Sequence, residues 1–134
     1  MSTFQLEVLT HERTVILTDV EYVGLPGKNG RFGVLKGHIP IMAALKLGIL
    51  EFGSYRGKRR KIALSGGFAQ MQGNKLVVMA NTAELAEEID VLRAQRAKER
   101  AERRLSEKKD DLDFARAQTA LRKAILRLEI ADGE

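Results

Sequence analysis

Glycine and proline divide the sequence into two parts that cannot fold in the same way. Eleven of the twelve glycines lie between Gly24 and Gly73, both prolines fall in the same stretch, and residues 74–132 contain neither residue type. Glycine and proline mark turns and interrupt helices. We therefore expect a first part made of short strands joined by turns, followed by a second part of uninterrupted helix.

The first part carries short apolar segments separated by turn residues. Residues 4–9 alternate apolar and polar side chains, as a half-buried strand does. Residues 72–75 lie between two apolar segments and predict a hairpin. Many short strands with frequent turns are typical of a sandwich or flattened barrel of roughly eight to ten strands. The expected strands include residues 4–9, 15–17, 20–23, 49–52, 61–64, 68–71 and 76–79.

The second part predicts two antiparallel helices. The first begins at Glu84, capped by Asn81, or at Asp90, and ends at Leu105. After a polar turn, the second begins at residue 110 or 111, where aspartates suit a helix N-terminus. Alanine-rich stripes let the helices approach closely but bury little area, so the hairpin needs a docking surface. The stripes are Ile89, Ala94, Ala97, Ala101 and Leu105, and Phe114, Ala117, Leu121, Ile125 and Leu128.

Composition excludes several classes of function. The chain has no cysteine, which excludes a disulfide framework, a thiolate metal site and a thiol nucleophile. Its two histidines, His11 and His38, cannot make a three-histidine metal site. No run of 18 apolar residues is present, and the first ten residues do not resemble a signal peptide. We therefore expect a cytoplasmic protein that does not span a membrane, without a metal site.

The positive charge is concentrated in the first part. The formal net charge is +5; residues 1–83 hold 11 Lys and Arg against 5 Asp and Glu, a net of +6, and residues 84–134 hold 12 against 13, a net of −1. Such a balance suggests an anionic partner. Five cations fall within residues 56–61. This turn is either a solvated hairpin tip or a patch for nucleic acid or acidic lipid, and Tyr55 is its one adjacent aromatic residue.

Cations also follow the predicted helices at spacings of three and four, as at Arg93, Arg96 and Arg100. Such stripes are either solvated helix faces or a surface for an acidic partner. With the turn centred on residues 108–109, Arg93 lies across from Lys123 and Arg127. This cation cluster, close to Asp90, favours a phosphate-bearing ligand. In the alternative interpretation, Asp90 only caps the helix and pairs with Arg93.

Several motifs resemble the epsilon subunit of F-type ATP synthase. Residues 30–40 read GRFGVLKGHIP and are similar to the family signature G-x-x-G-x-L-x-x-H-x-P. Residues 65–68, 81–84 and 89–94 continue the match, and residues 99–105 resemble epsilon subunits of bacilli. The resemblance implies an α+β fold, with a ten-stranded β-sandwich in residues 1–83 and an antiparallel two-helix hairpin in residues 84–134.

The resemblance also implies a function. Epsilon is a non-catalytic rotor subunit, peripheral at the cytoplasmic face of the cell membrane. It contacts the gamma subunit and the c-ring in a complex with alpha and beta subunits. ATP, with or without Mg²⁺, is a regulatory ligand that favours the compact hairpin, and the extended hairpin inhibits ATP hydrolysis. The alternative function is a basic nucleic-acid-binding module with a helical appendage.

The residues that match the family's functional positions form three sets. For contact with gamma and the c-ring they are Arg31, Phe32 and His38, where relatives often have an acidic residue in place of Arg31. For ATP they are Glu84, Asp90, Arg93, Arg100, Lys123 and Arg127, where the ATP-binding relatives have arginine in place of Lys123. For contact with beta they are Arg103, Arg104, Arg116 and Arg122. The sequence predicts no catalytic residue.

Overall fold

The computed structural model describes residues 2–37, 40–107 and 110–132. The chain divides into two compact units, of which the first ends at Ala86 and the second begins at Glu87. The sequence placed this division after residue 83. The observed boundary lies three residues later in the chain, because residues 83–85 form a short strand that pairs with the sheet of the first unit.

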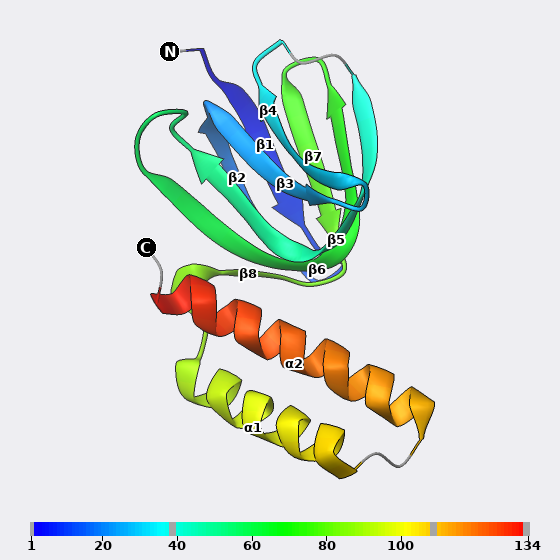
Figure 1. Ribbon diagram of the computed structural model, residues 1–134. Helices are drawn as coiled ribbons and strands as arrows, with labels where there is room; N and C mark the ends of the chain where they lie inside the picture. Colours follow the sequence, from blue (N-terminus) through cyan, green and yellow to red (C-terminus); the bar gives the residue numbers. More distant parts are fainter. Residues whose placement is uncertain (1, 38–39, 108–109, 133–134) are drawn as a thin grey trace. The chain divides into compact units, whose positions relative to one another are not determined.

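The first unit is a β-sandwich built from one mixed sheet (Figure 1). Its strand order is β2-β1-β7-β6-β5-β3-β4, with β8 paired to β6. The pairing of β1 with β7 is parallel and the others are antiparallel. The strands are β1 Phe4–Leu9, β2 Thr14–Val20, β3 Tyr22–Gly27, β4 Gly30–Leu35, β5 Ile41–Gly53, β6 Arg59–Gln72, β7 Lys75–Ala80 and β8 Ala83–Leu85.

The described residues contain eight strands, which agrees with the eight to ten expected from the turns but not with the ten that the resemblance implied. Two expected strands, residues 61–64 and 68–71, belong to the single strand β6. The intervening Gly66 and Gly67 have φ of +106° and +135°, which bends the strand without ending it. A Cβ atom on Gly67 would collide with the carbonyl oxygen of Met79. The double glycine therefore acts as a kink in a long strand, because only glycine fits this close approach.

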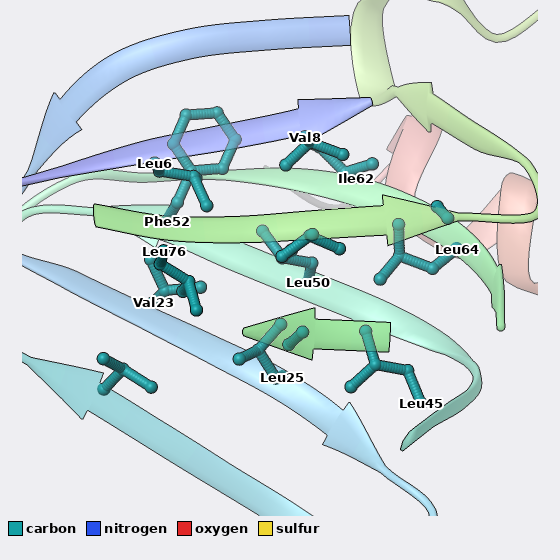
Figure 2. Close-up of a cluster of buried hydrophobic side chains, with 14 of the residues drawn as sticks. Leu6, Val8, Val23, Leu25, Leu45, Leu50, Phe52, Ile62, Leu64 and Leu76 are labelled. Atoms are coloured by element: carbon teal, nitrogen blue, oxygen red, sulfur yellow. The ribbon is translucent and has the colours of Figure 1, made fainter. Parts of the chain in front are cut away.

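The core of the sandwich comes from the alternating inward side chains of its strands (Figure 2). Along β1, Phe4, Leu6 and Val8 are completely buried. Along β5 and β6, Leu50 and Ile62 are paired and fully buried. All the residues of this core cluster belong to the first unit. The hydrophobic effect can therefore stabilise the sandwich without contributions from the helices.

The second unit holds two helices, α1 Val91–Glu107 and α2 Asp111–Asp132, joined as an antiparallel hairpin, and a 3₁₀ turn spans the boundary between the two units in the chain (Figure 1). Asp90 caps α1, since its Oδ1 accepts the Arg93 backbone N–H at 3.1 Å. Asp110 caps α2 in the same way, accepting the Asp113 N–H at 2.7 Å. The 3₁₀ turn, Ala86–Glu88, precedes the first cap. Of the two helix starts left open by the sequence, Asp90 is therefore the one that is used.

Alanines form the buried seam of the hairpin. Ala94 and Ala101 are buried on α1, and Ala117 and Ala124 are buried on α2. In each helix the two alanines are seven residues apart, which puts them on one face. The expected stripe ran through Ile125, but that side chain is 37% exposed and Ala124 takes the buried position. In the part of the chain that the structure describes, no helix combines the length and the apolar character that a membrane crossing requires.

Candidate functional site

The residues predicted to contact gamma and the c-ring do not form one surface in the described structure. Arg31 and Phe32 are neighbours on β4, so their side chains leave opposite faces of the sheet. Arg31 is exposed, and its Nη1 donates to the Ile49 carbonyl oxygen at 2.6 Å. Phe32 packs against the sandwich core. His38, the third predicted residue, lies outside the described residues.

A network around Arg59 organises the basic hairpin tip between β5 and β6. The Arg59 guanidinium lies over the Tyr22 ring at 4.2 Å and pairs with Glu51 at 3.4 Å. It also donates to the backbone oxygens of Ser54 at 3.1 Å and Tyr55 at 2.6 Å. Arg59 therefore joins the tip to β3, and its charge is partly balanced within the sandwich.

Tyr22 also contacts the backbone of the neighbouring strands. A Cβ on Gly33 would lie 2.7 Å from the Tyr22 ring, and one on Gly24 would lie 3.0 Å from its hydroxyl. Because glycine backbone and the Arg59 guanidinium both cover this ring, little of it is left for stacking on a nucleobase. Tyr22 lies beside Tyr55, with ring centroids 5.8 Å apart, and is thus part of the scaffold. This arrangement does not favour the nucleic-acid alternative.

An apolar row crosses the outer face of the sheet, and sequence reasoning missed it. Ala44 on β5 pairs with Phe68 on β6, Phe68 pairs with Met79 on β7, and Met79 pairs with Leu9 on β1. Phe68 is 54% exposed and Met79 is 53% exposed. The exposed Met42 continues the patch on β5. We call Leu9, Ala44, Phe68 and Met79 the apolar row.

A signal for the apolar row was present in the sequence. Residues 76–80 are five consecutive apolar residues, whereas a strand with one solvated face alternates. Both faces of β7 are therefore apolar: Leu76 and Val78 are buried in the core, while Met79 is directed outward. Large exposed apolar patches on a folded domain mark interaction surfaces.

Five of the six residues predicted to contact ATP belong to the hairpin. Asp90 precedes α1, while Arg93 and Arg100 lie on α1, seven residues apart and both exposed. Lys123 and Arg127 are half-buried on α2. In an antiparallel hairpin, the first turn of α1 lies beside the later turns of α2. The sixth residue, Glu84, lies on β8 in the other unit.

The arginines predicted to contact beta fall into two pairs. All four, Arg103, Arg104, Arg116 and Arg122, are exposed. Arg104 and Arg116 line a hollow of about 240 Å³ between the helices, together with Glu107, Asp113 and Ala117. Arg103 and Arg122 are not among the residues that line it. The described residues contain no group of three or more His, Asp or Glu side chains placed to hold a metal ion.

Comparison with known proteins assigns both units to one family. The β-sandwich domain of the ATP synthase delta/epsilon chain matches residues 3–86, and the long α-helix domain of the same chain matches residues 87–132. The chain belongs to the ATP synthase delta/epsilon family. Its similarity to this family therefore covers both units, which is more than a shared sandwich fold would give.

Curated relatives and solved structures agree with this assignment. The ATP synthase epsilon chain of Nitratidesulfovibrio vulgaris (strain DP4) is 46% identical over 93% of this chain and 92% of the relative. That of Syntrophomonas wolfei is 43% identical over 98% and 96%. A chain in the Euglena gracilis mitochondrial ATP synthase OSCP/F1/c-ring structure aligns with a TM-score of 0.76 at 26% identity, covering 91% of this chain and 77% of that one.

Proposed function

We propose that this protein is the epsilon subunit of the central stalk of a bacterial F-type ATP synthase, without catalytic activity of its own. The observation that carries the proposal is the match of both units, end to end, to the two domains of one family. As part of that complex, the protein would be held peripherally at the cytoplasmic face of the cell membrane. Its direct partners would be the gamma subunit and the c-ring, in a complex that also contains the alpha and beta subunits.

The sandwich would attach the protein to the rotor through the apolar row. Phe68 lies at the centre of the row, flanked by Ala44 and Met79 on the neighbouring strands. Burial of exposed apolar side chains is the main source of affinity at stable interfaces, and a few central residues dominate. We assign the row to the gamma subunit. Arg31, Phe32 and His38 remain proposed contacts with gamma and the c-ring.

Replacing one residue of the row tests this attachment. Phe68→Ser in the full chain should weaken co-purification with gamma about tenfold or more, because a central interface residue typically contributes more than about 1.4 kcal/mol. Leu35→Ser is the matched control, since Leu35 is also exposed but lies on β4, away from the row. Equal binding of the two variants would show that gamma uses another face. Thermal unfolding of both variants checks that each sandwich is intact.

The hairpin would bind ATP as a regulatory ligand at its open end, which we define as the end formed by Asp90, Arg93 and Arg127. Arginine forks suit phosphate oxygens, and the Asp90 carboxylate can accept from an amino or hydroxyl group. Arg100 and Lys123 complete the proposed set within the hairpin, and Glu84 stays a prediction from the sequence. The described residues provide no cluster of carboxylates for a catalytic metal. In this proposal, bound ATP is sensed rather than cleaved.

The hairpin would be a two-state brake on ATP hydrolysis. The buried seam is built from alanine side chains, which contribute little apolar area, so a modest ligand energy can decide between compact and extended states. ATP would favour the compact state. In the extended state, four cations would face acidic segments of beta. We call them the outer arginines: Arg103, Arg104, Arg116 and Arg122.

A further inference from the structure

The hairpin sequence contains an internal repeat with an offset of 23 residues. Residues 84–105 and 107–128 are identical at nine of twenty-two aligned positions. Both segments contain Glu-x₅-Asp-x₂-Arg-Ala-x₂-Ala-x₂-(Arg/Lys)-Ala-x₂-Arg, which begins at Glu84 in the first segment and at Glu107 in the second. Acidic, cationic and alanine positions are thus shared between the two segments, and the cationic and alanine positions lie on the two helices.

The structure shows that the two copies use the same face. The first seam alanine of the repeat is Ala94 in α1 and Ala117 in α2, and the second is Ala101 and Ala124; all four are buried. Two copies of one pattern that pack antiparallel through the same positions are related by an approximate two-fold axis, as in an isologous interface. The shared positions from Asp90 to Arg104 at one end of the hairpin therefore have counterparts from Asp113 to Arg127.

That counterpart is the hollow at the turn end of the hairpin. Its four polar lining residues, Arg104, Glu107, Asp113 and Arg116, all belong to the repeat motif. Arg116 and Asp113 occupy the repeat positions of Arg93 and Asp90. Glu107 occupies that of Glu84, and Arg104 that of Arg127. Three of the four polar groups around the hollow thus have a counterpart at the open end, whereas Glu84, the repeat equivalent of Glu107, lies on β8 in the other unit.

We propose that the turn end of the hairpin holds a second site for the phosphate groups of a nucleotide. Arg104 and Arg116 approach the hollow from different helices, so their guanidinium forks can hold the same phosphate chain. Asp113 and Glu107 can accept from amino or hydroxyl groups of the nucleoside. A hollow of about 240 Å³ is smaller than the usual small-molecule pocket, so it would enclose only part of the ligand.

The second site would also connect ligand binding with the brake. Arg104 and Arg116 belong to the outer arginines, so a ligand between them would withdraw both from a partner. This consequence, and the choice of a nucleotide as the ligand, rest on the proposed function. The hollow, its charges and the repeat are independent of the proposed function.

Backbone amide NMR of the full chain tests the proposal, with Mg-ATP and inorganic pyrophosphate as separate probes. We expect saturable shifts at residues 104–107 and 113–117, in addition to those at 90–94. Arg104→Gln with Arg116→Gln should abolish the shifts at the turn end and leave the open end unchanged. The matched control is Arg103→Gln with Arg122→Gln, which removes the same charge from the same helices outside the hollow. Helicity of each variant is checked by circular dichroism.

Each outcome decides between the two sites. Saturation at the open end without shifts at the turn end would overturn the second site and leave the proposed function standing. Saturation only at the turn end would support the second site and contradict the proposed ATP site. Equal loss of binding in the control would reduce the effect to general attraction by positive charge, and the proposal would be wrong. Binding of pyrophosphate as tightly as ATP would assign the site to phosphate alone and contradict the nucleoside contacts.

Discussion

Asp90 can act as a helix cap and as a contact for the ligand, and two substitutions at this position distinguish the two roles. Its Oδ1 accepts the Arg93 N–H at 3.1 Å, so the carboxylate stabilises the first turn of α1. Asp90→Ala removes both the cap and the charge. Asp90→Asn keeps an oxygen in the capping position and removes only the charge, and asparagine is as good a cap as aspartate.

The expected magnitudes follow from these contacts. Loss of the cap should cost about 0.5–2 kcal/mol of helix stability in Asp90→Ala and close to nothing in Asp90→Asn. Loss of a charge-assisted contact with ATP should cost about 1.5–3 kcal/mol, or roughly 10- to 150-fold in Kd, in both variants. Any loss of affinity in Asp90→Asn is therefore attributable to the ligand contact rather than to fraying of α1.

Isothermal titration of the full chain with ATP, combined with thermal melting followed by circular dichroism, measures both quantities. Asp90→Asn should melt like the wild type and bind ATP at least tenfold more weakly. If Asp90→Asn binds ATP with the wild-type Kd, Asp90 is only a helix cap and the proposed ligand contact is refuted. If Asp90→Ala alone loses affinity, the loss comes from the helix end and not from the carboxylate charge.

Three further predictions concern single positions or one boundary. Lys123→Arg should bind ATP equally or more tightly in the same titration, since an arginine fork can hold a phosphate with two hydrogen bonds; weaker binding would contradict the assignment of this position. A fragment ending at Ala86 should fold and join gamma, since the core cluster lies entirely within the sandwich, and loss of co-purification would count against this division. Gly67→Ala should lower sandwich stability by more than about 1 kcal/mol in denaturant unfolding, because its Cβ would collide with backbone; unchanged stability would contradict that reading.

Local signals in the sequence predicted the division into sheet and hairpin, the start of the second helix to within one residue, and two alternative starts for the first helix. Asp90 and Asp110 act as caps through contacts three residues away, and such short-range patterns are visible in a single sequence. The number of strands was not predictable in this way. The expected strands 61–64 and 68–71 left Gly66 and Gly67 between them, but these glycines bend β6 against the backbone of β7, a contact that depends on the tertiary structure.

In the candidate site, too, some features follow from local sequence patterns and others depend on the tertiary structure. The cations of the hairpin and three of its four seam alanines, Ala94, Ala101 and Ala117, were predicted from helical periodicity, whereas Ala124 was not. The place of Arg59 was not, because it depends on Tyr22, which is 37 positions earlier in the chain. The apolar row likewise depends on the register of four strands. The hairpin repeat is visible in the sequence, but its significance depends on which alanines are buried and where the hollow lies.

ATP hydrolysis by rebuilt complexes is the most direct test of the hairpin as a brake. Four complexes are compared at low and high ATP: one without epsilon and three with the full chain, the fragment ending at Ala86, or the full chain with the outer arginines replaced by alanine. At low ATP we expect inhibition by the full chain, full release in the fragment and partial release in the arginine variant. Because exposed charges are screened by salt, the difference made by the arginines should shrink at high ionic strength. Equal hydrolysis with the full chain and the fragment at every ATP concentration would contradict the central claim that the hairpin inhibits the enzyme.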